Sequence, residues 1–436
     1  MATIVQKYGG SSLRDLDAIT RVSRRIADTA AAGHQLVVVV SAMGDTTDEL
    51  LDLSHQLTAT PDPREQDLLL ATGEIVSMTL LAINLNAIGI EATSFTGGQA
   101  GIITNDLHGH ARIVEVRPER IQRSLAEGKV VLVAGFQGVA EESGELTTLG
   151  RGGSDTTAVA LAAALDAQVC EIYTDVAGVF TADPRLVPDA GKLDWLCYDD
   201  MLELAAHGCQ VLLDRCVEYA RNCQVVIHVR SSFSDDPGTW ISERRGTGAE
   251  LSPFSRSICG IAQNAGLAKV MVRAGDDVGG ESIALLVQTM AEAGLPIDRL
   301  ETSAADRASG QLEISLLMAA EDAPRAIAAL TADQQRLGLS AVACDDKIGS
   351  VAVIGRGMRA DPVAAFEFVQ AVEVADAHAG SLMVSDSAIS ATIDAAALPS
   401  VVRSLHASFG LDRAAAELTG GLSVIEQISS VLAGGS

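Results

Sequence analysis

The strongest constraint on the fold is a set of short segments that are apolar on both faces. Residues 36–40 read Leu-Val-Val-Val-Val and residues 130–134 read Val-Val-Leu-Val-Ala. Strands of this kind must be covered on both sides, which is typical of a parallel sheet between two layers of helices. They alternate with helical patterns from residue 3 to about 230, one of which spans 15–33 and ends at a glycine. The pattern predicts an α/β fold, a three-layer αβα sandwich with a mainly parallel sheet.

Composition changes at a polar segment over residues 242–257, which contains Gly and Pro and is typical of a linker. Beyond it, residues 267–298 show a strand, a loop and a helix, and residues 349–380 repeat this order. A repeat beside an enzyme domain indicates a small-molecule sensor or an oligomerisation platform. The predicted division is an α/β domain over 1–243, a linker over 244–260, two smaller units over 261–345 and 346–425, and a tail over 426–436.

The charge of the chain limits its partners. It carries 31 basic and 57 acidic residues, a net charge of −26, whereas nucleic acids and anionic membranes attract basic patches. A phosphate ligand is still compatible, because helix N-termini present backbone N–H groups to anions. The chain has no charged-then-apolar leader and no apolar run of 18 residues, and its seven cysteines do not suit a disulfide framework. We therefore expect a cytoplasmic protein that binds neither nucleic acid nor membrane.

Two polar motifs follow the first two predicted strands. Lys7 precedes a Gly-Gly-Ser run at 9–11, where paired glycines let the backbone approach a phosphate and the lysine adds a point charge. The segment 41–48 places small hydroxyl groups at the carboxyl end of a strand, the usual ligand edge of an open α/β sheet. Each motif also has a simpler interpretation, a plain β-turn for the first and helix capping for the second.

The third motif, residues 150–157, runs directly into an alanine-rich helix. Its three glycines, its guanidinium and its hydroxyl groups form a strong anion site at a helix N-terminus. Arg151 is suited to holding a carboxylate through two hydrogen bonds. Asp155 is an acidic residue in the same loop, and it either caps the helix or organises a lysine or a metal ion near a transferred group.

The fourth motif is a strand that ends in Thr174 and Asp175, followed by a glycine turn and an Asp-Pro-Arg turn at 183–185. It could hold a nucleoside and its phosphates, although on its own it is an ordinary loop. Glu74 is a further candidate, a lone glutamate within an apolar helical pattern. Such a position is usually solvated, but an amino-acid substrate needs an acceptor for its ammonium group and Glu74 could supply it.

These motifs, in this order, resemble those of the aspartate kinases of the amino-acid kinase family. The matching segments are VQKYGGSS, VVSAMGDTTDEL, SFTGGQAG, AGFQGV, TTLGRGGSDTTAVALAAALDA and EIYTDVAGVFTADPR. The resemblance covers essentially all of residues 1–242 and is greatest to the actinobacterial type. It implies that 1–243 is the catalytic domain. The C-terminal units resemble the paired ACT domains of that family more loosely, which implies two α+β ferredoxin-like units.

The resemblance implies that ATP with Mg²⁺ phosphorylates the β-carboxylate of L-aspartate, giving 4-phospho-L-aspartate in the first step of lysine, threonine and methionine biosynthesis. It assigns Lys7 to neutralising the transferred phosphoryl group and Asp155 to orienting Lys7. The implied aspartate contacts are Thr47, Glu74, Arg151, Gly153 and Ser154. The implied nucleotide contacts are Lys7, Gly9, Gly10, Ser11, Ser41, Thr174, Asp175, Phe180, Asp183 and Arg185. Such a transfer needs in-line positioning and charge neutralisation, not a covalent protein intermediate.

The chain departs from the family pattern at Gln210. A lysine that contacts the nucleotide phosphates usually occupies this place, in a pattern like G-[SA]-K-V-L. Loss of one hydrogen bond to a charged group costs about 1–3 kcal/mol when nothing replaces it. We therefore expect weaker ATP binding or slower turnover, with the other contacts retained.

The effector region departs as well. The family's D-x-P-G loop, Gln-Asn pair and T-S-E-I pattern are all altered here, so only weak effector contacts are expected, at Asp276, Gly279, Thr302, Ser303 and Ser385. We expect a weak response, or none, to inhibition by lysine plus threonine. The ACT units also predict a homo-oligomer, a dimer or a tetramer.

Two other functions stay open. One is another amino-acid kinase of the same fold, such as a glutamate or acetylglutamate kinase, against which the contexts of Glu74 and Arg151 argue. The other is a catalytically weak homologue that acts as a regulatory or scaffolding partner, which only Gln210 supports.

Overall fold

The structure is a computed structural model that describes residues 2–243, 257–274, 280–304 and 312–411. It divides into two compact units, each considered by itself. The described residues of the first unit are 2–181 and 191–243, and the second unit takes the remainder, including the short segment 182–190.

The first unit is built on an eight-stranded sheet with the order β10-β12-β11-β9-β1-β2-β6-β3. All neighbouring strands are parallel except the pair β11 and β12. The strands are β1 (Thr3–Tyr8), β2 (Gln35–Val40), β3 (Ala92–Phe95), β6 (Val130–Ala134), β9 (Val169–Thr174), β10 (Trp195–Cys197), β11 (Ile227–Ser231) and β12 (Thr239–Ser242). The prediction of a mainly parallel α/β sheet is confirmed.

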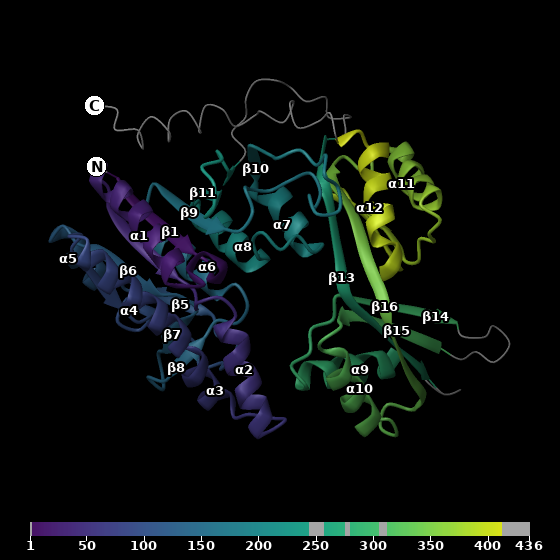
Figure 1. Cartoon of the computed structure of the whole chain (residues 1–436). Coiled ribbons are helices and arrows are strands. Elements are labelled where there is room, and N and C mark those ends of the chain that lie inside the picture. The colour runs from purple at the N-terminus through teal and green to yellow at the C-terminus, as the bar shows by residue number, and fades with distance from the viewer. Residues whose placement is uncertain (1, 244–256, 275–279, 305–311, 412–436) are drawn as a thin grey trace. The chain divides into compact units, whose positions relative to one another are not determined.

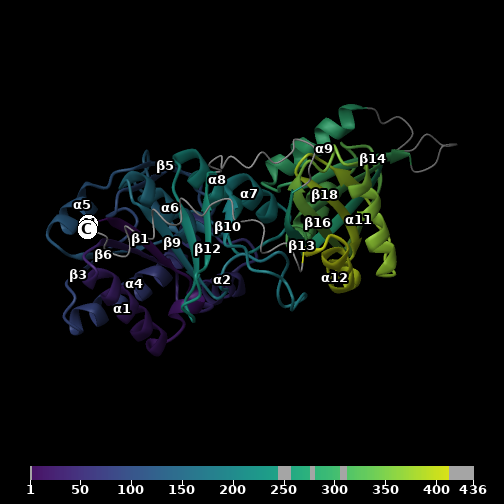
Figure 2. The same ribbon diagram turned by 90° about the horizontal axis from the view of Figure 1, so that it is seen from above.

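Helices cover both faces of this sheet. The labels of α1 (Leu16–Ala31) and α4 (Thr72–Ala87) lie on one side of the strands, and those of α6 (Gly153–Ala164) and α8 (Asp214–Cys223) on the other (Figure 2). The other helices of the unit are α2 (Thr46–Leu57), α3 (Pro63–Leu70), α5 (Glu119–Ala126) and α7 (Tyr198–Ala206). Strands that are apolar at every position are therefore buried from both sides, as the sequence pattern requires.

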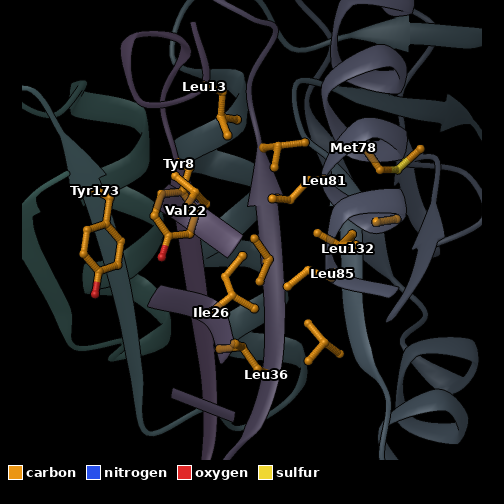
Figure 3. Packing of buried hydrophobic residues seen from close by; sticks show 14 of the residues in the cluster. Tyr8, Leu13, Val22, Ile26, Leu36, Met78, Leu81, Leu85, Leu132 and Tyr173 are labelled. Atoms are coloured by element: carbon orange, nitrogen blue, oxygen red, sulfur yellow. The ribbon is translucent and has the colours of Figure 1, made fainter. Parts of the chain in front are cut away.

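The core between the sheet and the layer of α1 and α4 consists of aliphatic side chains with a pair of tyrosines beside them (Figure 3). The rings of Tyr8 and Tyr173 stack with centroids 4.7 Å apart. The buried aliphatic side chains include Ile4, Leu13, Ile19, Ile26, Leu36, Val38, Val40, Leu81, Leu85 and Leu132. This layer fixes β1 against β2, and so fixes the position of the loops that follow them.

The helices α3 and α4 form an apolar stretch, 63–87, that is long enough to cross a membrane by length and composition alone. Half of its most apolar window is buried inside the first unit. Met78, Leu81 and Leu85 belong to the core described above, and the stretch also buries two carboxyl groups, those of Asp67 and Glu74. The stretch packs here as a pair of core helices.

A smaller four-stranded sheet, ordered β5-β4-β7-β8, lies in the same unit. Its strands are β4 (Ile102–Thr104), β5 (Ile113–Val116), β7 (Gln137–Ala140) and β8 (Leu146–Thr148). The buried hydroxyl groups of Thr104 and Thr147 lie 2.6 Å apart across it. Strand β8 leads directly into the glycine loop before α6, so this sheet positions one of the predicted binding motifs.

The second unit contains a six-stranded antiparallel sheet, ordered β14-β15-β13-β16-β18-β17. Its strands are β13 (Ser257–Ala274), β14 (Arg299–Ala304), β15 (Leu312–Ala319), β16 (Leu339–Arg356), β17 (Leu382–Val384) and β18 (Ala388–Asp394). Its helices are α9 (Gly280–Glu292), α10 (Ala323–Ala332), α11 (Pro362–Val374) and α12 (Leu398–Ser408). Strands β13 and β16 run side by side along almost their whole length (Figure 1).

These two long strands join two α+β halves. The first half takes the end of β13 with β14, β15 and the start of β16. The second half takes the end of β16 with β17 and β18, and its remaining strand is the start of β13, where Gln263 pairs with Val351. Residues that precede the first half in the chain therefore complete the second. The predicted boundary at 345/346 lies within β16, and the predicted domain limits stay a prediction.

Candidate active site

The centre of the site is an ion pair between a strand and a helix. The Nζ atom of Lys7, near the end of β1, lies 2.6 Å from Oδ1 of Asp155 in the first turn of α6. The two side chains are 10% and 13% exposed. Because desolvation offsets most of the attraction in such pairs, a largely buried ion pair is weak evidence for stability. The pair lies at the carboxyl end of a parallel sheet, where open α/β folds usually bind their ligands, and this position favours a functional role for it.

The first two motifs form a single packed layer. A side chain at Gly10 would place its Cβ 2.7 Å from the carbonyl oxygen of Gly44 and 3.0 Å from that of Ala42. The N–H group of Gly44 donates to the oxygen of Gly10 at 3.0 Å, and that of Ser41 donates to Tyr8 at 3.0 Å. The backbones approach so closely that only glycine fits at Gly10. Backbone contacts thus bring the predicted positions Gly10 and Ser41 together, and Ser11 is exposed in the short helix Gly10–Leu13 that follows Gly9.

Lys7 reaches over the first of these turns. A Cβ at Gly9 would stand 3.6 Å from the Lys7 ammonium nitrogen and 3.7 Å from the carbonyl oxygen of Tyr173. The Gly9 N–H group donates to that same oxygen at 3.3 Å. The turn therefore lies beside the end of β9, next to Thr174.

The glycine loop before α6 has the conformation that its sequence predicts. Gly152 has a φ of 68° and is the N-cap residue of α6, a left-handed conformation that favours glycine. Ser154 is buried beside Gly135, where an added Cβ would lie 2.8 Å from the Ser154 hydroxyl oxygen. Arg151 is exposed just ahead of the helix. The start of α6 is thereby held against the residue that follows β6.

Glu74 is buried rather than solvated, which excludes the simpler interpretation of this residue. Its side chain lies in the first turn of α4, and its Oε1 atom accepts a hydrogen bond from the N–H group of Ala42 at 3.1 Å. Its Oε2 atom is buried and has no hydrogen-bond partner among the described residues. Burial raises the pKa of Glu74 to about 7. A buried carboxylate with one unsatisfied oxygen suits the binding of a cation.

The remaining predicted contacts of the first unit lie at the start of α2, at the end of β9 and in the loops that follow β9 and α7. Thr47 is half-buried in the first turn of α2. The Thr174 hydroxyl group donates to Oδ1 of the exposed Asp175 at 3.1 Å, and Phe180 is partly buried in the loop that follows. Gln210 is exposed in the loop after α7.

Asp183 and Arg185 are found in the second unit. They form an ion pair with each other, with Nη2 of Arg185 2.8 Å from Oδ2 of Asp183. Hydrogen bonds from Arg185 lower the pKa of Asp183. The relation of this pair to Thr174 and Asp175 stays a prediction.

The predicted effector residues are scattered. Thr302 and Ser303 are exposed on β14. The Ser385 hydroxyl oxygen accepts from the N–H group of Ala388 at 2.8 Å, which commits it to a turn between β17 and β18. Asp276 and Gly279 lie outside the described residues.

Sequence reasoning missed two polar residues that support the site. The Ser77 hydroxyl group donates to the carbonyl oxygen of Ser41 at 2.7 Å. Asp67 of α3 is 1% exposed, and its carboxylate holds two loops of the small sheet. The signal that singled out Glu74, an acidic residue in an apolar helical pattern, applies equally to Asp67.

The profile of the amino acid kinase family matches residues 2–231. An aspartokinase of Mycolicibacterium smegmatis is 48% identical over 411 residues, covering 94% of this chain and 97% of that protein. An aspartokinase of Thermus thermophilus is 42% identical, covering 95% of this chain and 100% of that protein.

Two solved structures are also similar. The aspartate kinase from Synechocystis is 39% identical with a TM-score of 0.52, covering 94% of this chain and 69% of that one. Aspartokinase III of E. coli, at 22% identity and a TM-score of 0.77, shares the fold over 94% of this chain and 100% of its own. The kinase domain and the ACT-type halves of this chain are therefore those of a known architecture. The chain belongs to the amino acid kinase family and, within it, to the aspartokinases.

Proposed function

We propose that this kinase transfers the γ-phosphoryl group of ATP to the β-carboxylate of L-aspartate, giving 4-phospho-L-aspartate and ADP. The observation that carries the proposal is the shielded pair of Lys7 and Asp155 between two glycine turns. Asp155 holds the ammonium group of Lys7 beside Gly9, and the backbone N–H groups of the residues that follow, Gly10 and Ser11, would bind phosphate oxygens. Lys7 then neutralises charge on the phosphoryl group as it moves between donor and acceptor.

Glu74 and Arg151 account for the choice of acceptor. L-Aspartate has one ammonium group and two carboxylates, so a matching site needs one buried acceptor and one cation besides Lys7. The unsatisfied Oε2 of Glu74 supplies the acceptor, and the guanidinium group of Arg151 at the start of α6 supplies the cation. Thr47, Gly153 and Ser154 would complete the contacts. Aspartokinase III of E. coli, which has the same fold, was crystallised with aspartate and ADP.

ATP would bind as its Mg²⁺ complex at the ends of β1 and β9. Among residues 2–243 and the described parts of the second unit, no group of three or more His, Cys, Asp and Glu side chains gathers as a metal site. In kinases Mg²⁺ keeps several waters and is held largely through substrate phosphates. A site without a preformed cluster of ligands is therefore compatible with Mg²⁺ that enters bound to the nucleotide. Bound in that way, Mg²⁺ would neutralise phosphate charge.

The second unit would serve as an assembly and effector module. Strand β17 is an edge of its sheet and exposes three consecutive apolar residues, Leu382, Met383 and Val384. An exposed apolar edge strand is a ready surface for pairing with another chain. We propose a homo-oligomer, a dimer or a tetramer, formed through this unit, and sedimentation analysis of Met383→Lys against the unchanged protein tests it. A Met383→Lys protein with an unchanged mass would contradict the assignment to β17.

Feedback inhibition is expected to be weak. The hydroxyl group of Ser385 is committed to a turn, and Thr302 and Ser303 are exposed side chains on β14. A structure of E. coli aspartokinase III holds lysine together with aspartate, so lysine is the first effector to test. We expect most of the activity to persist at millimolar lysine plus threonine, and full inhibition would refute this.

Hydroxylamine trapping tests the proposed function directly. An acyl phosphate reacts with hydroxylamine to give a hydroxamate, which is measured by its ferric complex. We expect hydroxamate from aspartate with ATP, and none above background from glutamate or N-acetylglutamate. Hydroxamate from glutamate alone would favour a different amino-acid kinase. Its absence with every acceptor would favour a regulatory or scaffolding partner.

A further inference from the structure

The carboxylate of Asp67 ties together segments that are distant in the sequence. Its Oδ2 atom lies 2.7 Å from Nδ1 of His108, and both of its oxygens lie 3.1 Å from the N–H group of Gly109. The Thr148 hydroxyl group donates to its Oδ1 atom. Asp67 is 1% exposed, so its two oxygens are satisfied entirely by these three residues of the small sheet and its loops.

These contacts determine where the glycine loop before α6 lies. Thr148 is the last residue of β8 and leads into that loop, and its carbonyl oxygen accepts from Ala111 at 2.9 Å. Gly150 packs on the same segment, since an added Cβ would stand 3.1 Å from the Gly109 oxygen and 3.1 Å from Nδ1 of His110. The loop that carries Arg151 therefore packs against the turn at 108–111.

Asp67 is also joined to the helix that carries Glu74. It lies on α3, which runs into α4 at Ala71. The Ala71 carbonyl oxygen accepts a hydrogen bond from Nε2 of Gln137 at 3.0 Å, a second link between these helices and the small sheet. One buried carboxylate therefore connects the segment of Glu74 with the segment of Arg151.

We infer that Asp67 is a positioning residue for aspartate, because it sets the separation between the predicted ammonium acceptor and the predicted carboxylate-binding guanidinium group. The inference rests on the proposed function. L-Aspartate presents its ammonium and carboxylate groups at a nearly constant spacing, so a shift of about 1 Å between Glu74 and Arg151 would weaken binding. Asp67 makes no hydrogen bond to Lys7, Gly9 or Gly10, which lie on β1 and its turn, so the KM for ATP should change less than the KM for aspartate.

The test compares Asp67→Asn with Asp62→Asn by steady-state kinetics in the hydroxamate assay. Asp62 is an exposed residue that caps the same helix through the N–H groups of Arg64 and Glu65, and within residues 2–243 no hydrogen bond joins it to the turn at 108–111 or to Thr148. Asn at 67 keeps the shape of the side chain. Its NH₂ group replaces one acceptor oxygen, however, and would face a hydrogen-bond donor. We expect Asp67→Asn to raise the KM for aspartate about tenfold or more, with the KM for ATP and kcat within about twofold. Asp62→Asn should leave all three unchanged.

An equal rise in both KM values, a fall in kcat alone, or unchanged kinetics would overturn the inference, since a merely structural role does not separate the two substrates. If Asp67→Asn is unfolded at the assay temperature, Thr148→Val decides the question, because it removes a single donor to Asp67 and should raise the KM for aspartate selectively. Failure of the proposed function has a different readout. In that case the unchanged protein itself would form no hydroxamate from aspartate.

Discussion

Lys7 and Asp155 lie 2.6 Å apart, on β1 and on α6, and the ammonium nitrogen of Lys7 lies beside the turn at Gly9. A double-mutant cycle separates the catalytic role of this pair from its structural role. Lys7→Met and Asp155→Asn should each lower kcat, Lys7→Met by about a hundredfold or more. Each single change leaves one buried charge without its counter-charge, so each should also lower Tm. The double variant should recover Tm but not activity.

Lys192→Met is the matched control for this cycle. Lys192 forms an ion pair with Asp194 at 2.8 Å in the same unit, but it is not among the predicted site residues. Its loss should leave kcat unchanged. Recovery of activity in the Lys7→Met and Asp155→Asn double variant would show that the pair is only structural.

Glu74→Gln should stabilise the substrate-free protein and weaken the binding of aspartate. Burial raises the pKa of Glu74 from 4.5 to about 7, so the folded state loses stability as the pH rises from the usual carboxyl range toward 7. A neutral glutamine avoids this loss while its oxygen still accepts from Ala42. We expect Glu74→Gln to stabilise the substrate-free protein by about 3 kcal/mol at pH 8 and not at pH 4, measured by denaturant unfolding. A gain of the same size at both pH values would contradict this.

The same group should control the pH dependence of aspartate binding. An ammonium group pairs with ionised Glu74, whose population falls as the pH drops below its pKa of about 7. The KM for aspartate should therefore rise as the pH is lowered from 8 to 6, while the KM for ATP changes little. In Glu74→Gln the KM for aspartate should be high and should not vary with pH over this range. A pH-dependent KM in that variant would assign the titration to another residue.

Gln210→Lys should lower the apparent KM for ATP. Gln210 is exposed in the loop after α7, so a lysine can be accommodated and can supply a phosphate-facing charge. Gain of a charged hydrogen bond corresponds to about 1–3 kcal/mol, or roughly a tenfold fall in KM. Gln56→Lys, at an exposed position on α2, controls for the general effect of adding a charge. An unchanged or raised KM for ATP in Gln210→Lys would contradict the expectation that residue 210 faces the phosphates of ATP.

Gly9→Ala and Gly10→Ala separate packing from phosphate access. A Cβ at Gly10 would collide with backbone oxygens at 2.7 and 3.0 Å, whereas one at Gly9 would meet its neighbours at ordinary contact distances. Gly10→Ala should lower the free energy of unfolding by about 1–3 kcal/mol. Gly9→Ala should fold normally but reduce kcat/KM for ATP, because its methyl group lies beside the Lys7 ammonium. Equal destabilisation by both changes would contradict the geometry of this turn.

Much of the first unit could be predicted from the sequence, because its signals are local. Strands that are apolar on both faces, such as 36–40, require a covered parallel sheet, and glycines before an alanine-rich helix require a turn at its N-terminus. The pairing of Lys7 with Asp155 followed from the family resemblance. Nothing local indicates that these two side chains meet.

What could not be predicted depends on long-range pairing. Periodicity identifies β13 and β16 as strands, but it does not show which parts of them pair. The sequence therefore did not reveal that residues 257–264 form a strand of the second half. Asp67 carries the same local signal as Glu74, an acidic residue in an apolar helical pattern. Its role could not be predicted, because its partners are at the distant positions 108, 109 and 148.

The site of Lys7 and Asp155 is proposed to phosphorylate the β-carboxylate of aspartate. The most direct measurement is the rate of aspartyl hydroxamate formation from ATP, aspartate and hydroxylamine, compared between the unchanged protein and Lys7→Met. We expect hydroxamate formed in step with ADP by the unchanged protein, and a rate at least about a hundredfold lower in folded Lys7→Met. No hydroxamate from the unchanged protein, or an equal rate from Lys7→Met, would contradict it.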